Sequence, residues 1–327
     1  MLKFKIFFLF ALLLLITIAA QANEKGLKKT TFIPQWVPQS QFAGYFVAQE
    51  KGFYRKHGLE VKILRGGPDY PPSALLKEKR ADFGTMFLST GIQKRSQGLP
   101  IVNIGQIVQR SSLMLVAKKS SGIYSPRDIN GRKVGLWGSE FQVQPKAFFK
   151  KHNLHVTIIP QSATLNLFLR NGVDVASAMW YNEYHTIINS GINPTELTTF
   201  FLSEYSVNFP EDGIYCLKKT FDHDPALCRD FVKASLEGWE YAFDNPEPAL
   251  DIVMKYVVDG NIATNRVHQK WMLERMKDII NPSGNTVPLG TLQAGDYNRV
   301  VQELKVNRLI TAVPSFSDFF IDCVSHD

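Results

Sequence analysis

Short apolar runs alternate along this chain with segments whose apolar positions recur at helical spacing. This pattern predicts strands and helices that follow one another in turn. Compact apolar runs predict strands at 30–36, 60–64, 82–87 and 101–108. Helices are expected between them, at 41–50, 72–79 and 89–97. This β-α-β-α order is typical of a mostly parallel sheet covered by helices on both faces.

The same rhythm restarts after 112–118, a strand that is expected to leave the first unit. The second unit has expected strands at 133–137, 156–160 and 173–179 and expected helices at 143–151, 164–170 and 181–189. A strand from Gly213 is expected to cross back, and the chain beyond it is mainly helical. We therefore predict an α/β protein in which 23–116 and 213–327 form lobe 1 and 117–212 forms lobe 2. The crossings are placed near 115 and 212, and the C-terminal helices cover lobe 1.

The N-terminus has the three parts of a secretory signal. Lys3 and Lys5 precede an apolar core from Ile6 to Ile18, and Ala20-Gln21-Ala22 is an A-x-A cleavage site. A membrane anchor is the alternative, but the run is short for a span and lacks a stop-transfer flank. We expect residues 1–22 to be removed after Ala22 and the mature chain to be periplasmic.

Charge and cysteine content exclude several classes of partner. The net charge is +7, to which the expected signal contributes two lysines, and acidic and basic residues are interspersed. No basic run of the kind that follows a phosphate backbone is present, so nucleic acid is not expected as a partner. Cys216, Cys228 and Cys323 have no metal-ligand spacing. They are expected to be small buried residues. One disulfide between two of them is the alternative, and the sequence does not select the pair. No cofactor or metal is expected.

Candidate ligand-binding residues follow four of the predicted strands. In open α/β sheets ligands bind beyond the carboxyl ends of strands. The residues there combine aromatic rings with neutral amides and a carboxylate, which suits a flat heterocycle better than an anion. The predicted site residues are Trp36, Gln39, Gln41, Phe42, Ser89, Trp137, Glu140, Tyr181, Asn182 and Glu183.

Each of these residues also has a plain structural interpretation. Trp36 could be ordinary core, and the glutamines of its turn could be solvated. Ser89 could be only the N-cap of its helix. Glu140 and Glu183 could stand in first helical turns because acidic residues are favoured there by the helix dipole.

The run from Gln35 to Ile63, QWVPQSQFAGYFVAQEKGFYRKHGLEVKI, resembles the solute-binding proteins related to thiamine-pyrimidine synthases. Four later stretches strengthen the resemblance, at 128–135, 178–184, 211–215 and 234–242. The resemblance implies a type II periplasmic-binding-protein fold that closes on a small ligand. It also implies ABC permease and ATPase subunits as partners of a monomeric receptor. The thiamine-precursor receptors of the family bind a formylated aminopyrimidine, and Trp36, Tyr181, Asn182 and Glu183 are the best-matched positions.

The resemblance leaves two competing functions. The family includes synthases that make a pyrimidine from pyridoxal phosphate and their own histidine. Those enzymes are cytosolic and Cys-rich, whereas this chain has a signal, no His in its first turn and no Cys cluster. Similar domains also act as sensor modules, so a sensor subunit for a separate signalling protein is the other alternative. We predict a receptor, not an enzyme.

Overall fold

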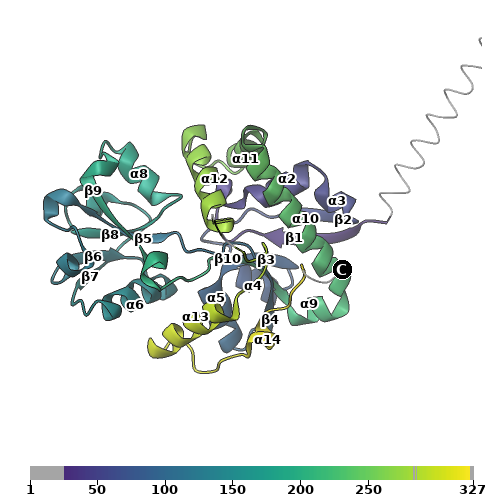
Figure 1. Ribbon diagram of the computed structural model, residues 1–327. Coiled ribbons are helices and arrows are strands. Elements are labelled where there is room, and N and C mark those ends of the chain that lie inside the picture. The colour runs from purple at the N-terminus through teal and green to yellow at the C-terminus, as the bar shows by residue number, and fades with distance from the viewer. Residues whose placement is uncertain (1–25, 283, 285, 325–327) are drawn as a thin grey trace, which may run out of the picture.

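A computed structural model of the chain describes residues 26–282, 284 and 286–324. Figure 1 shows two lobes side by side, each built around its own sheet. The expected signal and its cleavage after Ala22 lie outside the described residues. Among the described residues, no helix combines the length and the apolar character that a membrane span needs.

The first sheet has the strand order β2-β1-β3-β10-β4. Its strands are β1 (Lys28–Ile33), β2 (Leu59–Ile63), β3 (Phe83–Phe87), β4 (Ile101–Gln106) and β10 (Asp212–Leu217). β1 runs parallel to β2 and β3, whereas β10 is antiparallel to both of its neighbours. The sheet is therefore mixed, because its returning strand enters from the other lobe.

The second sheet repeats this plan with the order β7-β6-β8-β5-β9. Its strands are β5 (Leu113–Lys118), β6 (Lys133–Leu136), β7 (Thr157–Pro160), β8 (Val175–Met179) and β9 (Leu197–Phe201). β6 is parallel to β7 and β8, and β5 is antiparallel to β8 and β9. The sequence pattern predicted every strand of this sheet except β9.

Two connections join the lobes, at 107–112 and 207–211. β5 pairs within the second sheet, although 113–116 had been placed with lobe 1. Asp212 already belongs to β10 of the first sheet, although it had been placed in lobe 2. We propose that the lobes divide at these two connections, a few residues from the expected boundaries.

Helices pack around both sheets. Those of the first lobe's N-terminal part are α2 (Ala43–Glu50), α3 (Phe53–Lys56), α4 (Pro72–Lys77) and α5 (Leu88–Ser96), with the 3₁₀ turn η1 (Ser40–Phe42). The second lobe has α6 (Val143–Lys151), α7 (Asn166–Leu169) and α8 (Glu183–Asn189), with the 3₁₀ turns η2 (Lys119–Ser121), η3 (Pro126–Ile129), η4 (Ser139–Gln142), η5 (Pro194–Glu196) and η6 (Leu202–Tyr205). The C-terminal set is α9 (Lys218–His223), α10 (Pro225–Asp244), α11 (Pro246–Asp259), α12 (Arg266–Ile280), α13 (Ala294–Val306) and α14 (Phe316–Phe319). α9, α13 and α14 had not been predicted.

The C-terminal helices cover the first lobe, as expected from the sequence. Phe231 of α10 stacks on Phe83 of β3 with ring centroids 4.2 Å apart. α10 also lies directly against α2. A Cβ added to Gly44 would stand 2.3 Å from the Trp239 ring, and one added to Gly238 would stand 2.0 Å from the Gly44 carbonyl oxygen. Only glycines allow this approach of the two helices. All three cysteines are buried and unpaired.

Candidate functional site: the junction between the lobes

A network of amides surrounds a buried carboxylate where the first sheet meets the junction. Asp212 begins β10, and its Oδ2 accepts a hydrogen bond from Gln41 Nε2 at 2.9 Å. Its Oδ1 accepts another from Gln35 Nε2. Gln39 Nε2 in turn donates to Gln41 Oε1 at 2.6 Å. The turn after β1 is therefore held against β10 by side chains that are far apart in the sequence.

A second carboxylate stands beside the first and ties the two connections together. Glu211 Oε1 accepts from the Ser112 backbone N–H at 2.6 Å and from the Ser112 hydroxyl at 2.9 Å. The Ser111 hydroxyl donates to the same oxygen at 3.3 Å. Glu211 lies on the returning connection and the serines lie on the outgoing one, so this carboxyl bridges the hinge.

Burial makes both carboxyls reluctant to ionise. It raises the pKa of Glu211 to about 7, although the serine donors oppose the rise. It raises the pKa of Asp212 to about 8, with the charge of Glu211 adding to the effect and the two glutamines opposing it. Tyr181 is buried beside them, and the pKa of its hydroxyl is raised well above the usual value by burial and then by the nearby carboxylates. The site can therefore hold or release protons near neutral pH.

A small cavity of about 30 Å³ lies at this junction, between the two sheets' strand ends. Its polar lining residues are Ser89, Ser111, Gln144 and Glu211, and its apolar ones are Phe87, Leu113, Phe141, Met179, Phe209 and Pro210. Phe87 of the first lobe meets Phe141 of the second edge-to-face, with centroids 5.4 Å apart. The lining set contains no Lys, Arg, His or Cys.

Outside the cavity the lobes touch through α12 and the segment after β8, which Figure 1 shows leaning toward each other. Trp271 Nε1 donates to the Trp180 carbonyl oxygen at 3.0 Å, and the Trp271 ring stacks on His185 at 4.9 Å. Arg275 lies over both indole rings, 4.7 Å from Trp271 and 4.9 Å from Trp180. His268 Nε2 lies 2.9 Å from Asn182 Oδ1. These contacts place the lobes in a closed arrangement.

The Tyr181-Asn182-Glu183 segment stands at this interface, but its carboxylate has local partners. Glu183 Oε2 accepts from the Met179 backbone N–H at 3.0 Å, and Oε1 accepts from Asn182 Nδ2 at 2.8 Å. Burial raises the pKa of Glu183 against these donors. Glu183 thus shapes its own turn and orients Asn182 toward α12. Direct contact of this segment with a ligand stays a prediction.

The other predicted residues divide between the cavity, the glutamine network and more distant positions. Ser89 lines the cavity and is not the N-cap of α5, a position held by Phe87. Phe42 is fully buried in the first lobe's core. Trp36 is 38% exposed and does not line the cavity. Trp137 Nε1 donates to the Ser162 carbonyl oxygen at 3.1 Å, and its ring meets Phe141. The side chain of Glu140 lies outside the described part of the structure.

Sequence reasoning did not select Glu211 and Asp212, Gln35, or the cavity's phenylalanines. The signal that could have found the carboxyls was their position, two adjacent acids at the start of a strand that crosses between lobes. Gln35 could have been found by its place beside Trp36, at the end of a predicted strand.

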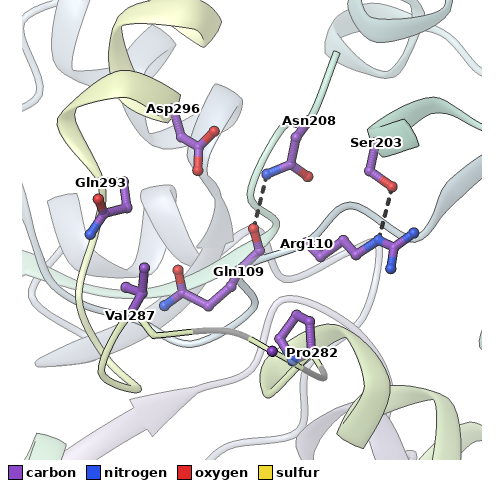
Figure 2. Close-up of a pocket in the computed structure, with 9 residues that line it drawn as sticks. Gln109, Arg110, Ser203, Asn208, Pro282, Val287, Gln293 and Asp296 are labelled. Carbon is purple, nitrogen blue, oxygen red and sulfur yellow. Dashed lines mark hydrogen bonds between the residues drawn. The ribbon is translucent and has the colours of Figure 1, made fainter. Parts of the chain in front are cut away.

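A broader hollow of about 420 Å³ lies on another side of the junction (Figure 2). Gln109 and Arg110 line it from the outgoing connection, Ser203 lines it from the second lobe, and Asn208 lines it from the returning connection. Their donors already have protein acceptors: Asn208 Nδ2 bonds the Gln109 carbonyl oxygen, and Arg110 Nε bonds the Ser203 hydroxyl. We place the candidate site at the smaller cavity, because that cavity contains the buried carboxyl and faces both sets of strand ends.

The comparisons with known proteins identify the family. A model described as NMT1/THI5 like matches residues 39–249, which is well over half of the chain. The chain belongs to the NMT1/THI5-like family. It is 22% identical to the riboflavin-binding protein RibY of Chloroflexus aurantiacus over 303 residues, covering 88% of this chain and 84% of that protein. It is 20% identical to the formylaminopyrimidine-binding protein of Halalkalibacterium halodurans, covering 86% of each. It is also 25% identical to a 4-amino-5-hydroxymethyl-2-methylpyrimidine phosphate synthase of Legionella pneumophila, covering 69% of this chain and 72% of the enzyme.

Two solved structures with the same architecture are periplasmic binding proteins. The aliphatic sulphonate binding protein SsuA of Escherichia coli matches with a TM-score of 0.72 at 12% identity, covering 91% of this chain and 94% of that one. Its counterpart from Methylobacillus flagellatus matches with a TM-score of 0.69 at 14% identity, covering 91% and 92%. Likeness at such identity concerns the fold alone. The family resemblance and the type II periplasmic-binding-protein fold expected from the sequence are both confirmed.

Proposed function

We propose that this protein is an extracytoplasmic solute-binding receptor of an ABC importer, and that its ligand is a small aromatic heterocycle such as a thiamine-related aminopyrimidine. The observation that carries the proposal is the cavity between the lobes, where the rings of Phe87 and Phe141 and the carboxyl of Glu211 come together. Aromatic walls suit a flat ring, and a carboxyl with nearby hydroxyls and amides suits its polar edge. The curated relatives named for riboflavin and formylaminopyrimidine support a nitrogen heterocycle.

The size of the cavity implies a hinge. A cavity of about 30 Å³ has room for little more than one water molecule. Small-molecule sites are typically of about 300–1,000 Å³. A heterocycle therefore enters only when the lobes separate, and the connections at 107–112 and 207–211 are the natural pivots.

Receptor function is favoured over pyrimidine synthesis by the chemistry of the lining. Neither a His nor a Cys lines the cavity, and Cys216, Cys228 and Cys323 are buried elsewhere. We propose that the protein carries out no turnover, is exported after cleavage behind Ala22, and delivers its ligand as a monomer to permease and ATPase subunits. Co-purification with a permease rather than with a signalling protein separates this role from that of a sensor subunit.

Calorimetric titration of the mature protein tests the ligand class. We expect saturable one-to-one binding of 4-amino-5-hydroxymethyl-2-methylpyrimidine, its formylaminopyrimidine relative or riboflavin, and no binding of methanesulfonate. Binding of the sulfonate alone would leave the fold assignment standing and contradict the proposed ligand class.

A further inference from the structure

Glu211 connects the cavity to the hinge more directly than any other residue of the candidate site. Its backbone N–H donates to the Val108 carbonyl oxygen at 3.1 Å, on the outgoing connection. Its own carbonyl oxygen accepts from the Leu88 backbone N–H at 3.1 Å, at the start of α5, and from Gln106 Nε2 at 3.0 Å. The main chain of Glu211 is thus anchored to the outgoing connection, to the start of α5 and to β4.

The two oxygens of its carboxyl are not equivalent. Oε1 receives the Ser112 N–H at 2.6 Å and the Ser112 hydroxyl at 2.9 Å. The Ser111 hydroxyl lies 3.3 Å from Oε1 and shares its single proton with Gln144 Oε1, at 3.1 Å. Among the contacts of the described residues, the hydrogen bond to Oε2 comes from the Ser112 hydroxyl, at 3.1 Å. The Leu113 N–H also lies near the carboxyl and donates to the Ser111 hydroxyl at 3.2 Å. The Ser112 hydroxyl has a single proton, which it shares between Oε1, Oε2 and the Met179 sulfur at 3.4 Å. Oε2 is therefore the oxygen with acceptor capacity to spare.

No protein cation balances this carboxyl. Among the interactions of the described residues, none pairs Glu211 with a Lys or Arg, although the residue is only 5% exposed and lines the cavity. A buried carboxyl without a countercharge or a full set of donors is costly to ionise. A donor that arrives in the cavity removes much of this cost, whereas an anion increases it.

We propose that Glu211 is the specificity-determining residue of the interlobe site: its Oε2 accepts a hydrogen bond from an amine or ring N–H of a heterocyclic ligand while Oε1 holds the hinge serines. The ligand class is then a neutral or cationic heterocycle with a donor edge, and anions are rejected. Because one carboxyl makes both sets of contacts, occupation of the cavity strengthens the tie between the two connections and favours closure. This inference rests on the proposed function and refines it.

A matched pair of probes tests the donor requirement on the unmodified protein. The probes are 4-amino-5-hydroxymethyl-2-methylpyrimidine and its analogue without the amino group, 5-hydroxymethyl-2-methylpyrimidine, titrated at pH 7 into the mature chain. We expect the amino compound to bind at least about tenfold more tightly, which corresponds to the loss of one charge-assisted hydrogen bond. Equal affinity for the two probes overturns the inference and leaves the receptor function standing. Failure of both probes and of riboflavin to bind overturns the inference and the proposed function together.

Glu211→Gln assigns the preference to this residue. Gln keeps an oxygen for the Ser112 N–H but presents an N–H₂ group to the ligand's amine, so the preference for the amino probe should fall below about threefold. Glu204→Gln is the control, because Glu204 is an exposed partner of Arg110 on the second lobe, and this variant should keep the full preference.

Calorimetry in two buffers of different ionisation heat adds a second readout. Binding of the amino probe should release a fraction of a proton in the parent and none in Glu211→Gln. A preference that survives in a folded Glu211→Gln protein contradicts the proposal.

Discussion

The imidazole rings of His185 and His268 face each other across the lobe interface, with their Nδ1 atoms 2.9 Å apart. His185 belongs to α8 of the second lobe and His268 to α12 of the first. Asn182 donates its amide N–H to Glu183, so its Oδ1 is the acceptor for His268 Nε2–H. His268 Nδ1 then accepts a hydrogen bond from His185 Nδ1–H. This chain of bonds requires the His268 ring to be neutral.

Acid should therefore weaken closure of the lobes. Burial lowers the pKa of His268 to about 4, with the second ring adding to the effect, and burial also lowers the pKa of His185. The neighbouring Arg275 adds a positive charge over Trp271. Above the ordinary pKa near 6.5 the histidine is neutral in both the open and the closed form, so its protonation does not oppose closure. As pH falls toward 4 the open form binds a proton before the closed form does, and the free energy of closure becomes less favourable.

We expect the fraction of closed molecules, measured by a fluorophore pair with one dye on each lobe, to fall between pH 6.5 and pH 4. His268→Asn should flatten this dependence. The exposed His155 provides the control, since His155→Asn should leave the curve unchanged. An identical pH profile in His268→Asn would show that the histidine pair does not control closure.

Protein stability should depend on pH through the buried carboxyls. Asp212 has a pKa of about 8 in the folded protein, against about 4 for an unfolded Asp. The folded chain thus holds a proton that the unfolded chain loses, and the free energy of unfolding should fall as pH rises from 4 to 8. Urea denaturation at pH 5, 6.5 and 8 measures the fall.

Asp212→Asn should reduce that dependence because the side chain no longer ionises. Its amide oxygen can still accept from one of Gln35 and Gln41. Asp251→Asn is the matched control at an exposed position and should keep the parent's slope. Parallel curves for the parent and Asp212→Asn would contradict the assignment of the raised pKa.

The contact of α2 with α10 should tolerate no added methyl group. Gly44→Ala drives a Cβ into the Trp239 ring, and overpacking of this kind typically costs about 1–3 kcal/mol. Gly295→Ala lies in α13 with open space around it and should be neutral or stabilising by up to about 1 kcal/mol. Chemical denaturation of the two variants should separate them. Equal stability would indicate that the helices shift apart without cost.

Truncation of Trp36 and of Phe42 should lower the free energy of unfolding by different amounts. Phe42 is fully buried, so Phe42→Ala should lower the free energy of unfolding by about 3–5 kcal/mol. Trp36 is 38% exposed, so Trp36→Ala should lower the free energy of unfolding by less than Phe42→Ala does. If Trp36 forms a ligand wall on opening and closing, the same variant should lose about 0.5–1.5 kcal/mol of binding free energy. Undiminished ligand affinity in Trp36→Ala would remove this residue from the site.

The sequence predicted the two-lobed fold because periodicity is a local property. The apolar runs marked most elements, whereas β9, α9, α13 and α14 were not predicted. The family resemblance then named the architecture. Boundaries were displaced by a few residues, because the strand at 113–118 has the same pattern whichever sheet it joins.

The candidate site was less predictable, because its contacts are set by topology. Gln41 and Asp212 lie 171 positions apart, and only the return of β10 beside β3 brings them together. Glu183 was selected from a motif, but sequence cannot show that a carboxylate bonds the backbone N–H of Met179. Glu211 was passed over because an acidic pair at a strand start usually faces solvent.

The most direct test of the account is the small molecule that the protein carries in its own compartment. The mature chain is isolated from periplasm without denaturation, washed and unfolded, and the released compounds are identified by mass spectrometry. We predict an aromatic nitrogen heterocycle with an amine or N–H donor, close to one per protein molecule in the parent and less in a Glu211→Gln preparation. Release of an alkanesulfonate or another anion in that amount would contradict it.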